Sequence, residues 1–419
     1  MSRIIEVVAA VIWQDDKFLI CQRPANKKQN PLQWEFPGGK VEPGETKEEA
    51  LIREIKEELN TVISVKDTAG EAEHTYPEFT VHLTFFNCEI VEGIPEKLEH
   101  NDFVWIDKFK TDNYDFCPSD KEFISKFINN QLDPNSFIFV MYNGIPYPPR
   151  YKSDISEIAG HFDKREIDSA ASYSLHTEYS YGKRKFDTEI ISRFPALIEA
   201  NKDNVPQLWK NLEWAESFAE FIIKLTEEQT APRIIEIHPP FNDYCTIDEL
   251  IERYNVFEKK IHQSYPNAII VLENRSGAVY RGGKFLVGKA KEIANLCEVI
   301  KRKNVNLGIV LDFPQLLTAE GIDPSKFNLQ KYQAAIDAIL PYRELIKGIH
   351  IWGKKKSESG RWVAHSGNLD TYFSNNTEIK KEFIKGIQQI CDDGIKRFFV
   401  PEVNSGFNDL CEIMSDLFG

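Results

Sequence analysis

Short apolar segments alternate with longer helical stretches from residue 136 to the end of the chain. Seven strand-sized segments stand out: SFIFVMY, SAASYSL, RIIEIHPP, AIIVLENRSG, VNLGIVLDFP, LIKGIHIWG and RFFVPEVN. An eighth strand is expected between Ile145 and Asp168. Regular alternation of strand and helix predicts a parallel sheet that closes on itself. We therefore predict an α/β TIM-type (βα)8 barrel over residues 133–419.

The first part of the chain has a different, strand-rich pattern. IIEVVAAVIW and KFLICQR predict a hairpin, HTYPEFTVHLTFFNCEI a pair of strands and DFVWI a further strand, with helices at 46–59 and 119–129. The polar segment NNQLDPNS contains a proline and is the expected linker. A chain of 419 residues exceeds the usual size of one core, so two domains are expected. Residues 1–132 form the first, an α+β domain.

Composition narrows the classes of function. The formal net charge of -14 disfavours nonspecific wrapping of a polyanion, although short basic runs such as GKKK leave room for a local basic patch. No apolar run is long enough to cross a bilayer, and the seven cysteines include no C-x-x-C pair. These features predict a cytoplasmic protein with reduced cysteines and no membrane partner.

An acidic helix follows a glycine turn in GGKVEPGETKEEALIREIKEELN. Thr46 and Glu49 have the spacing of a capping box, so the helix is expected to begin at Lys47. Beside its apolar face lie Glu54, Glu57 and Glu58. A solvated acidic face is one interpretation of these carboxylates. The other is a site for Mg²⁺ or Mn²⁺, which prefer hard oxygen ligands.

The same string resembles the Nudix box, G-x5-E-x7-R-E-U-x-E-E-x-G-U, in which U is aliphatic. Residues in register are Gly39, Glu45, Arg53, Glu54, Ile55, Glu57 and Glu58. Asn60 replaces the glycine of the motif and Thr61 its last aliphatic residue. Asparagine tolerates the left-handed conformation that ends many helices, so the metal-binding part is unaffected. The resemblance is closest to the MutT-like branch and implies a Nudix fold that hydrolyses a nucleoside triphosphate to monophosphate and pyrophosphate.

The resemblance also implies roles for single residues. Glu54, Glu57 and Glu58 would bind the metal ion, and Glu99 would bind metal or act as the base. Arg53 belongs to the same catalytic set. Residues expected to contact substrate are Arg23, Gly39, Lys40 and Asp120. Asp120 has two interpretations: its carboxylate accepts from a base, or it only favours the first turn of a helix capped by Ser119 and Glu122.

Strands of the second domain end in histidines and carboxylates. They are His176, His238, Glu273, Asp312, His350 and Glu402. In a parallel barrel, side chains at the carboxyl ends of different strands converge on one mouth. A single buried histidine at a strand end is better explained as a satisfied core residue, but six strand ends with histidine or carboxylate indicate a site for cations.

This second set resembles the xylose-isomerase-like barrels, and among them the endonuclease IV family, through HPP, ENRSG and His365. The resemblance implies that His176 and His238 bind one ion. Asp312, His350 and Glu402 would bind a second ion, and Glu273 would bridge the two. That family's third ion needs donors where this chain has Gln315 and Val363, and only His365 remains. We therefore expect two divalent ions, Zn²⁺ or Mn²⁺.

The two resemblances together predict a bifunctional hydrolase. The first domain would act on nucleoside triphosphates, and the barrel on a phosphodiester, with nucleic acid as a candidate partner. Two alternatives stay open for the barrel. It could be a sugar isomerase or epimerase, whose Glu-Asp-His-Glu set is also present, or a non-catalytic effector module with the first domain as nucleotide sensor.

Overall fold

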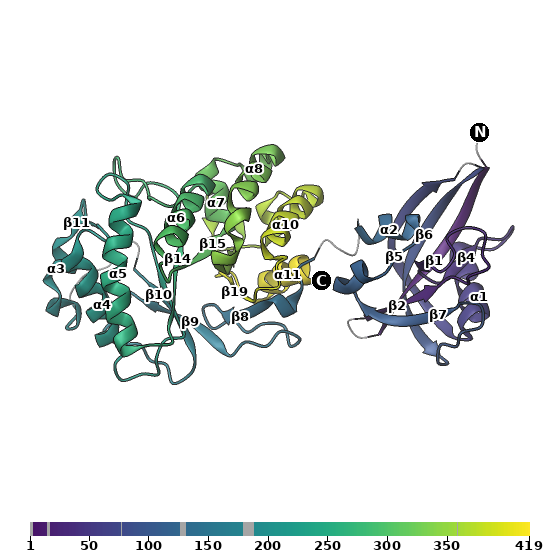
Figure 1. Cartoon of the computed structure of the whole chain (residues 1–419), viewed down its shortest axis with the longest axis horizontal. Coiled ribbons are helices and arrows are strands. Elements are labelled where there is room, and N and C mark those ends of the chain that lie inside the picture. Colours follow the sequence, from purple (N-terminus) through teal and green to yellow (C-terminus); the bar gives the residue numbers. More distant parts are fainter. Residues whose placement is uncertain (1–2, 15–16, 77, 126–130, 179–187, 358) are drawn as a thin grey trace. The chain divides into compact units, whose positions relative to one another are not determined.

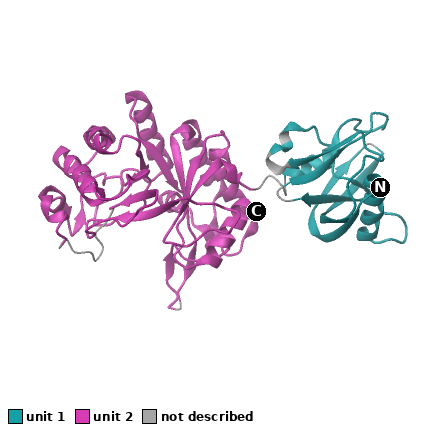
Figure 2. Cartoon of the chain, turned by 90° about the horizontal axis from the view of Figure 1, so that it is seen from below, with its two compact units in different colours: residues 1–130 teal, residues 131–419 magenta. Residues whose placement is uncertain are grey.

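The chain forms two compact units, Met1–Asn130 and Gln131–Gly419, coloured separately in Figure 2. The computed structural model describes residues 3–14, 17–76, 78–125, 131–178, 188–357 and 359–419. Among these residues, no helix is both long and apolar enough to cross a membrane. Each unit has its own hydrophobic core and is described by itself.

The first unit is built on a seven-stranded mixed sheet (Figure 1). Its strands are β1 (Arg3–Gln14), β2 (Lys17–Gln22), β3 (Trp34–Glu35), β4 (Gly38–Lys40), β5 (Val62–Thr75), β6 (Phe79–Glu92) and β7 (Asp102–Asp107). The order is β3-β2-β1-β6-β5, with β4 paired to β1 and β7 to β2. The β1–β2 pair is antiparallel, which confirms the predicted hairpin, and β1 runs parallel to β6.

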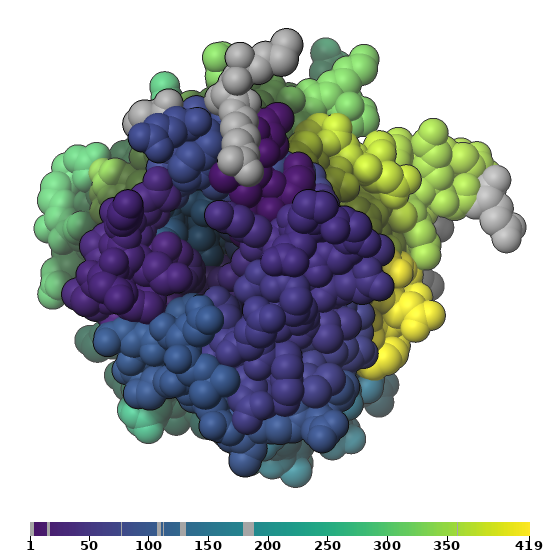
Figure 3. All heavy atoms as spheres, turned by 90° about the vertical axis from the view of Figure 1, so that its right-hand side faces the viewer, coloured from purple at the N-terminus to yellow at the C-terminus, as the bar shows by residue number. Residues whose placement is uncertain are grey.

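Helices lie on both faces of this sheet. Along β1, Val8, Ala10 and Ile12 share a core with α1 (Lys47–Leu59), whereas Ala9 and Val11 share the other core with Phe123 of α2 (Pro118–Phe123). This is the period of two that a strand imposes on its side chains. A turn of 3-10 helix, η1 (Lys108–Asn113), connects β7 to α2. The resulting three-layer α+β arrangement fits the predicted Nudix fold, and Figure 3 shows its surface in purple to blue.

Two local predictions for this unit were wrong. The segment HTYPEFTVHLTFFNCEI does not contain two whole strands, because β5 begins at Val62. Helix α2 begins at Pro118 with Cys117 as its N-cap and ends at Phe123, so Ser119 and Glu122 form no capping box. Part of the helix expected at 119–129 lies outside the described residues.

The second unit is a closed barrel of eight parallel strands. They are β8 (Phe137–Met141), β9 (Ile155–Gly160), β10 (Tyr173–Thr177), β13 (Ile234–Ile237), β14 (Ile269–Glu273), β15 (Gly308–Asp312), β16 (Ile346–Ile351) and β19 (Arg397–Pro401). The order around the barrel is β10-β13-β14-β15-β16-β19-β8-β9. The TIM-type fold is confirmed, and β9 is the eighth strand expected between Ile145 and Asp168.

Helices surround most of the barrel. They are α3 (Pro195–Glu199), α4 (Leu212–Thr226), α5 (Ile247–Ser264), α6 (Ala290–Lys303), α7 (Phe313–Glu320), α8 (Leu329–Ile339), α9 (Leu369–Tyr372), α10 (Thr377–Cys391) and α11 (Phe407–Phe418). Short hairpins join β11 (Asn201–Lys202) to β12 (Val205–Pro206) and β17 (Lys354–Lys356) to β18 (Trp362–Ala364). Residues 142–154 and 161–172, which connect β8 to β9 and β9 to β10, contain no helix. The outer ring therefore lacks a helix at the first two connections between strands.

The barrel interior changes from apolar to polar along the strands. One buried cluster gathers Val140, Ile155, Ile234, Val271, Val310, Phe398 and Val400. Two residues after four of these come Glu236, Glu273, Asp312 and Glu402, which face the same side of their strands. The alternation therefore carries acidic side chains to the carboxyl-terminal mouth, where barrel enzymes build their sites.

Candidate functional sites

The glycine pair of β4 packs directly against the acidic face of α1. The backbone N–H of Gly38 donates to Oε2 of Glu58 at 3.0 Å. A Cβ on Gly39 would lie 2.3 Å from Cδ of Glu54, so any other residue at this position would displace the Glu54 carboxylate. The structure thus brings Gly39 and two of the three predicted metal ligands together.

Arg53 joins the loop to the same face of the helix. Its guanidinium donates to Glu45 at 2.7 Å, to Glu54 at 2.9 Å and to the carbonyl of Lys40 at 3.1 Å. A longer contact of 3.4 Å reaches Glu57. Helix α1 itself begins at Lys47 behind the expected capping box. Arg53 therefore orients the carboxylates of Glu45, Glu54 and Glu57.

Glu58 is the most enclosed carboxylate of this face. Its side chain is 12% exposed, whereas that of Glu57 is 55% exposed. Burial raises the pKa of Glu58 well above its usual value, and the charges of Glu35, Glu54 and Glu99 add to this effect. His100 lies between two of these carboxylates, 3.4 Å from Glu35 and 3.9 Å from Glu58.

These donors suit an ion that keeps part of its water shell. A buried carboxylate beside others is stabilised by a nearby cation, and Mg²⁺ is commonly held by one or two carboxylates plus water and phosphate. Within the described residues of this unit, no three acidic, histidine or cysteine side chains bring ligand atoms within 4.8 Å of one another. The contacts from Arg53 hold Glu54 and Glu57 beside the loop.

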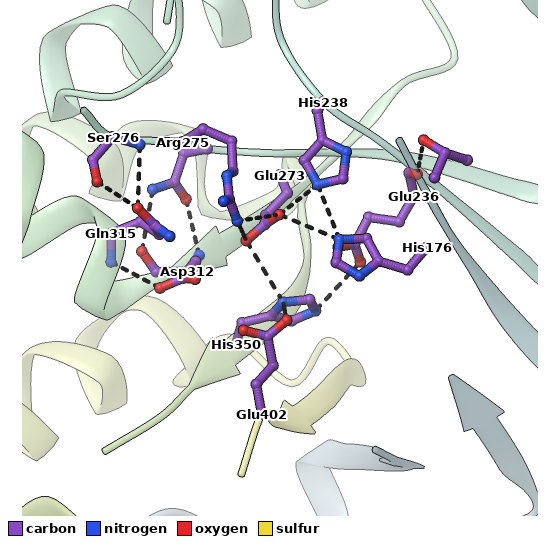
Figure 4. A network of polar contacts seen from close by, with 12 residues as sticks. His176, Glu236, His238, Glu273, Arg275, Ser276, Asp312, Gln315, His350 and Glu402 are labelled. Atoms are coloured by element: carbon purple, nitrogen blue, oxygen red, sulfur yellow. Dashed lines mark hydrogen bonds and ion pairs between the residues drawn. The ribbon is translucent and has the colours of Figure 1, made fainter. Parts of the chain in front are cut away.

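The barrel mouth gathers histidines and carboxylates from several strands (Figure 4). Nε2 of His176, on β10, lies 3.0 Å from Nε2 of His238, which follows β13. The same atom of His238 lies 2.7 Å from Oε2 of Glu273 on β14. Two imidazole nitrogens and a carboxylate oxygen that face one point are the donor set of a divalent ion.

A second group shares Glu273 with the first. Its other oxygen, Oε1, lies 3.8 Å from Nδ1 of His350 on β16, and that nitrogen lies 3.4 Å from Glu402. Ligand atoms of Glu273, His350 and Glu402 all lie within 4.8 Å of one another. Glu273 thus belongs to both groups of ligand atoms.

The first unit matches a family model described as a NUDIX domain over residues 7–126. The CTP pyrophosphohydrolase of Escherichia coli K12 is 36% identical over 126 residues, which cover 93% of that protein and 30% of this chain. The chain belongs to the NUDIX family. The 8-oxo-dGTP diphosphatase of the same organism is 28% identical and is 95% covered. A solution structure of MutT from methicillin-resistant Staphylococcus aureus is 38% identical and 98% covered, with a TM-score of 0.27. These matches cover about 30% of the chain and say nothing of the barrel.

Three further residues of the NUDIX unit were predicted to contact substrate. The guanidinium of Arg23 pairs with Glu35. Asp120 is buried, and its carboxylate accepts from the N–H of Phe36 at 2.8 Å and from Ser119 at 3.1 Å. Burial and the charge of Glu35 raise the pKa of Asp120 to about 7. Lys40 is exposed on β4.

Two predicted barrel residues make other contacts. Oδ1 of Asp312 accepts from the N–H of Gln315 at 2.8 Å, and Oδ2 accepts from Nε1 of Trp352 at 2.8 Å. Asp312 is thereby the N-cap of α7. His365 lies 3.1 Å from Glu402. Neither belongs to any of the four groups of ligand atoms found among the described residues.

Two carboxylates at the mouth went unnoticed in the sequence. Glu157 of β9 lies 3.2 Å from Nδ1 of His176. Glu236 of β13 lies 3.5 Å from His176 and 3.3 Å from His350. The two-residue period of a strand could have revealed Glu236, because it precedes His238 by two residues and therefore faces the same side.

The ionisable groups of the barrel mouth shift one another's pKa values strongly. Burial lowers the pKa of His238 to about 4, which leaves the imidazole neutral and able to bind metal. Burial would also lower the pKa of His176, but the charges of Glu157 and Glu236 outweigh it and raise that pKa well above its usual value. For Glu273, Arg275 and the two neighbouring histidines outweigh burial and lower the pKa. The mouth is therefore an acidic, enclosed site that suits cations.

Proposed function

We propose that the NUDIX unit hydrolyses a nucleoside triphosphate to monophosphate and pyrophosphate with Mg²⁺ or Mn²⁺. The observation that carries the proposal is the packing of β4 on α1, which fixes Glu58 by the N–H of Gly38 and leaves room for Glu54 above Gly39. The names of the two Escherichia coli relatives support a nucleoside triphosphate as substrate.

A bound ion would neutralise charge on the phosphate chain. Glu54, Glu57 and Glu58 would hold it, and Arg53 would keep Glu54 and Glu57 oriented. Glu99, or a glutamate of the helix, would accept the proton of the attacking water. Glu99 is exposed, and its charge is felt by Glu58.

Glu57→Gln tests this assignment, because it keeps the shape of the side chain and removes a negative charge. We expect pyrophosphate release to fall by about 10²–10³-fold, the usual effect of removing one electrostatic stabiliser. Glu48→Gln is the matched control, since Glu48 is exposed on the same helix and occupies a position that the motif leaves unspecified. Full activity of Glu57→Gln, or an equal loss in Glu48→Gln, would contradict the proposal.

Base selection is assigned to Asp120. Each carboxylate oxygen has a second lone pair, so Asp120 can still accept from an exocyclic amine while bound to Phe36 and Ser119. Cytosine and adenine offer such a donor. The order of preference among cytidine, adenosine and guanosine triphosphates should change in Asp120→Asn. An unchanged order would leave Asp120 with a structural role alone.

For the barrel we propose a two-ion hydrolytic site of phosphodiesterase type. The shared position of Glu273 favours it, since a bridging carboxylate lets two ions hold the attacking and leaving oxygens of one phosphodiester. Nucleic acid is then a candidate substrate, and an isomerase or an effector module is the rival. Tight binding of two ions and cleavage of an abasic-site duplex would support hydrolysis. One ion with sugar isomerisation, or no ion at all, would contradict it.

A further inference from the structure

Glu236 lies among the histidines of the barrel mouth, whereas the carboxylate of Asp312 makes other contacts. The backbone of Asp312 is fixed on both sides by Asn274, whose side chain accepts at 2.9 Å and donates at 3.1 Å. Both carboxylate oxygens of Asp312 accept hydrogen bonds, one from the start of α7 and one from Trp352. These four bonds orient Asp312 toward α7 and Trp352. The second group of ligands is therefore left without the aspartate that the resemblance implies.

Glu236 lies between the two histidines that belong to different groups. Its side chain projects from the middle of β13, and the residue is 2% exposed. Oε1 lies 3.5 Å from Nε2 of His176, and Oε2 lies 3.3 Å from Nε2 of His350. Figure 4 shows Glu236 directed toward His176 and His350.

One oxygen of Glu236 has no hydrogen bond. Oε1 is fully buried and has no hydrogen-bond donor among the described residues. A buried charged acceptor without a hydrogen bond is unfavourable, whereas coordination to a cation satisfies it. This oxygen lies 3.5 Å from Nε2 of His176, the nitrogen that also faces His238 and Glu273. The ligand atoms of these four residues all lie within 4.8 Å of one another.

We propose that Glu236 is a metal ligand, which completes a four-donor site with His176, His238 and Glu273, and that Asp312 is not a ligand. Two imidazole nitrogens and two carboxylate oxygens suit Zn²⁺ or Mn²⁺. The inference rests on the proposed metal centre of the barrel. It also gives Glu157 a positioning role, because its contact of 3.2 Å with Nδ1 of His176 fixes which nitrogen faces the ion.

The test measures binding of Mn²⁺ and Zn²⁺ to the full chain. Glu54, Glu57 and Glu58 are first changed to Gln, so that the NUDIX unit contributes no ions. Metal content after dialysis and titration calorimetry then give the number and affinity of the remaining ions. Glu236→Gln is compared with Asp312→Asn, a matched change at another buried carboxylate of the same mouth. Thermal unfolding in EDTA checks that both variants fold.

We expect Glu236→Gln to lose one of two tightly bound ions, or to bind it at least about 100-fold more weakly, and Asp312→Asn to retain both. Glutamine can still accept a hydrogen bond from His350. If Glu236→Gln binds both ions as the parent does, Glu236 is only a hydrogen-bond acceptor and the inference is overturned. Loss of an ion from Asp312→Asn would overturn it as well. If the parent chain binds no ion, the proposed metal centre itself fails, which is a separate outcome.

Discussion

Burial changes the protonation of Asp120 in the NUDIX unit. Its pKa is raised from 3.8 to about 7, so the folded state holds a proton that the unfolded state releases between these values. Stability from this group is present at low pH and is lost as the pH rises through about 7. At about 1.4 kcal/mol for each unit of pKa, the loss reaches about 4 kcal/mol.

Asp120→Asn should therefore become more stable relative to the parent as the pH rises from about 4 to about 7, and the difference should then level off. Urea unfolding of the smaller unit across this range measures it. Asp115→Asn is the control, because Asp115 is exposed and its pKa is lowered by hydrogen bonds from Gln33 and Lys121. A constant difference between Asp120→Asn and the parent would show that Asp120 titrates normally.

The location of strand-end residues at the barrel mouth was predictable from the sequence, but the contacts that their side chains make were not. His176, His238 and Glu273 could be placed at one mouth because a parallel barrel brings strand ends together. Whether an acidic side chain faces an ion or caps a helix depends on the residues that come after it in the chain. Asp312 precedes Phe313 and Pro314, which begin α7, and this makes it an N-cap. Glu236 was missed because it lies inside a strand and not at its end.

At the scale of elements, the residue that caps the carboxyl end of α1 has a left-handed backbone. Asn60 has φ 54° and ψ 28°, the conformation expected where the Nudix motif has glycine. Its side chain accepts from Lys56 at 2.9 Å and donates to Glu96 at 2.9 Å. Non-glycine residues other than asparagine and aspartate lose roughly 1 kcal/mol in this conformation.

Asn60→Ala should destabilise the NUDIX unit by about 1 kcal/mol, whereas Asn60→Gly should stay within about 0.5 kcal/mol of the parent. Glycine adopts the left-handed backbone without strain, and the substitution removes only the two exposed hydrogen bonds of the Asn60 side chain. Urea unfolding of both variants gives the comparison. Equal stability of the two would show that the backbone of Asn60 is not strained, and that its side-chain bonds decide the effect.

Strands with a clear apolar pattern were predictable from the sequence, whereas a strand of mostly polar residues was not. The barrel strands are short apolar runs, and β9 was found because barrel closure demanded an eighth strand between Ile145 and Asp168. Strand β5 has the polar sequence VISVKDTAGEAEHT, so its period gave no signal over most of its length. It is extended because β6 pairs with it over most of the length of both strands. Tertiary pairing, which no local pattern contains, decides such a segment.

For the whole molecule, two separate cores imply two separate responses to metal removal. The core of the NUDIX unit lies on both faces of its sheet, and that of the barrel lies inside and around its strands. The barrel buries its candidate ligands Glu236, Glu273 and Glu402, whereas Glu57 of the NUDIX unit is exposed. An ion bound to the folded state alone stabilises it by about 2.7 kcal/mol at one hundred times its Kd.

EDTA should therefore lower the midpoint of the larger calorimetric transition by about 5–10 °C and leave the smaller one unchanged. The larger enthalpy belongs to the barrel, which has more residues than the NUDIX unit. In Glu273→Gln, which removes the carboxylate common to both groups of ligands, EDTA should no longer shift the larger transition. A shift of the smaller transition instead would place the stabilising ion in the NUDIX unit. No shift in either would mean that the buried carboxylates of the barrel are compensated by His176, His350 and Arg275 alone.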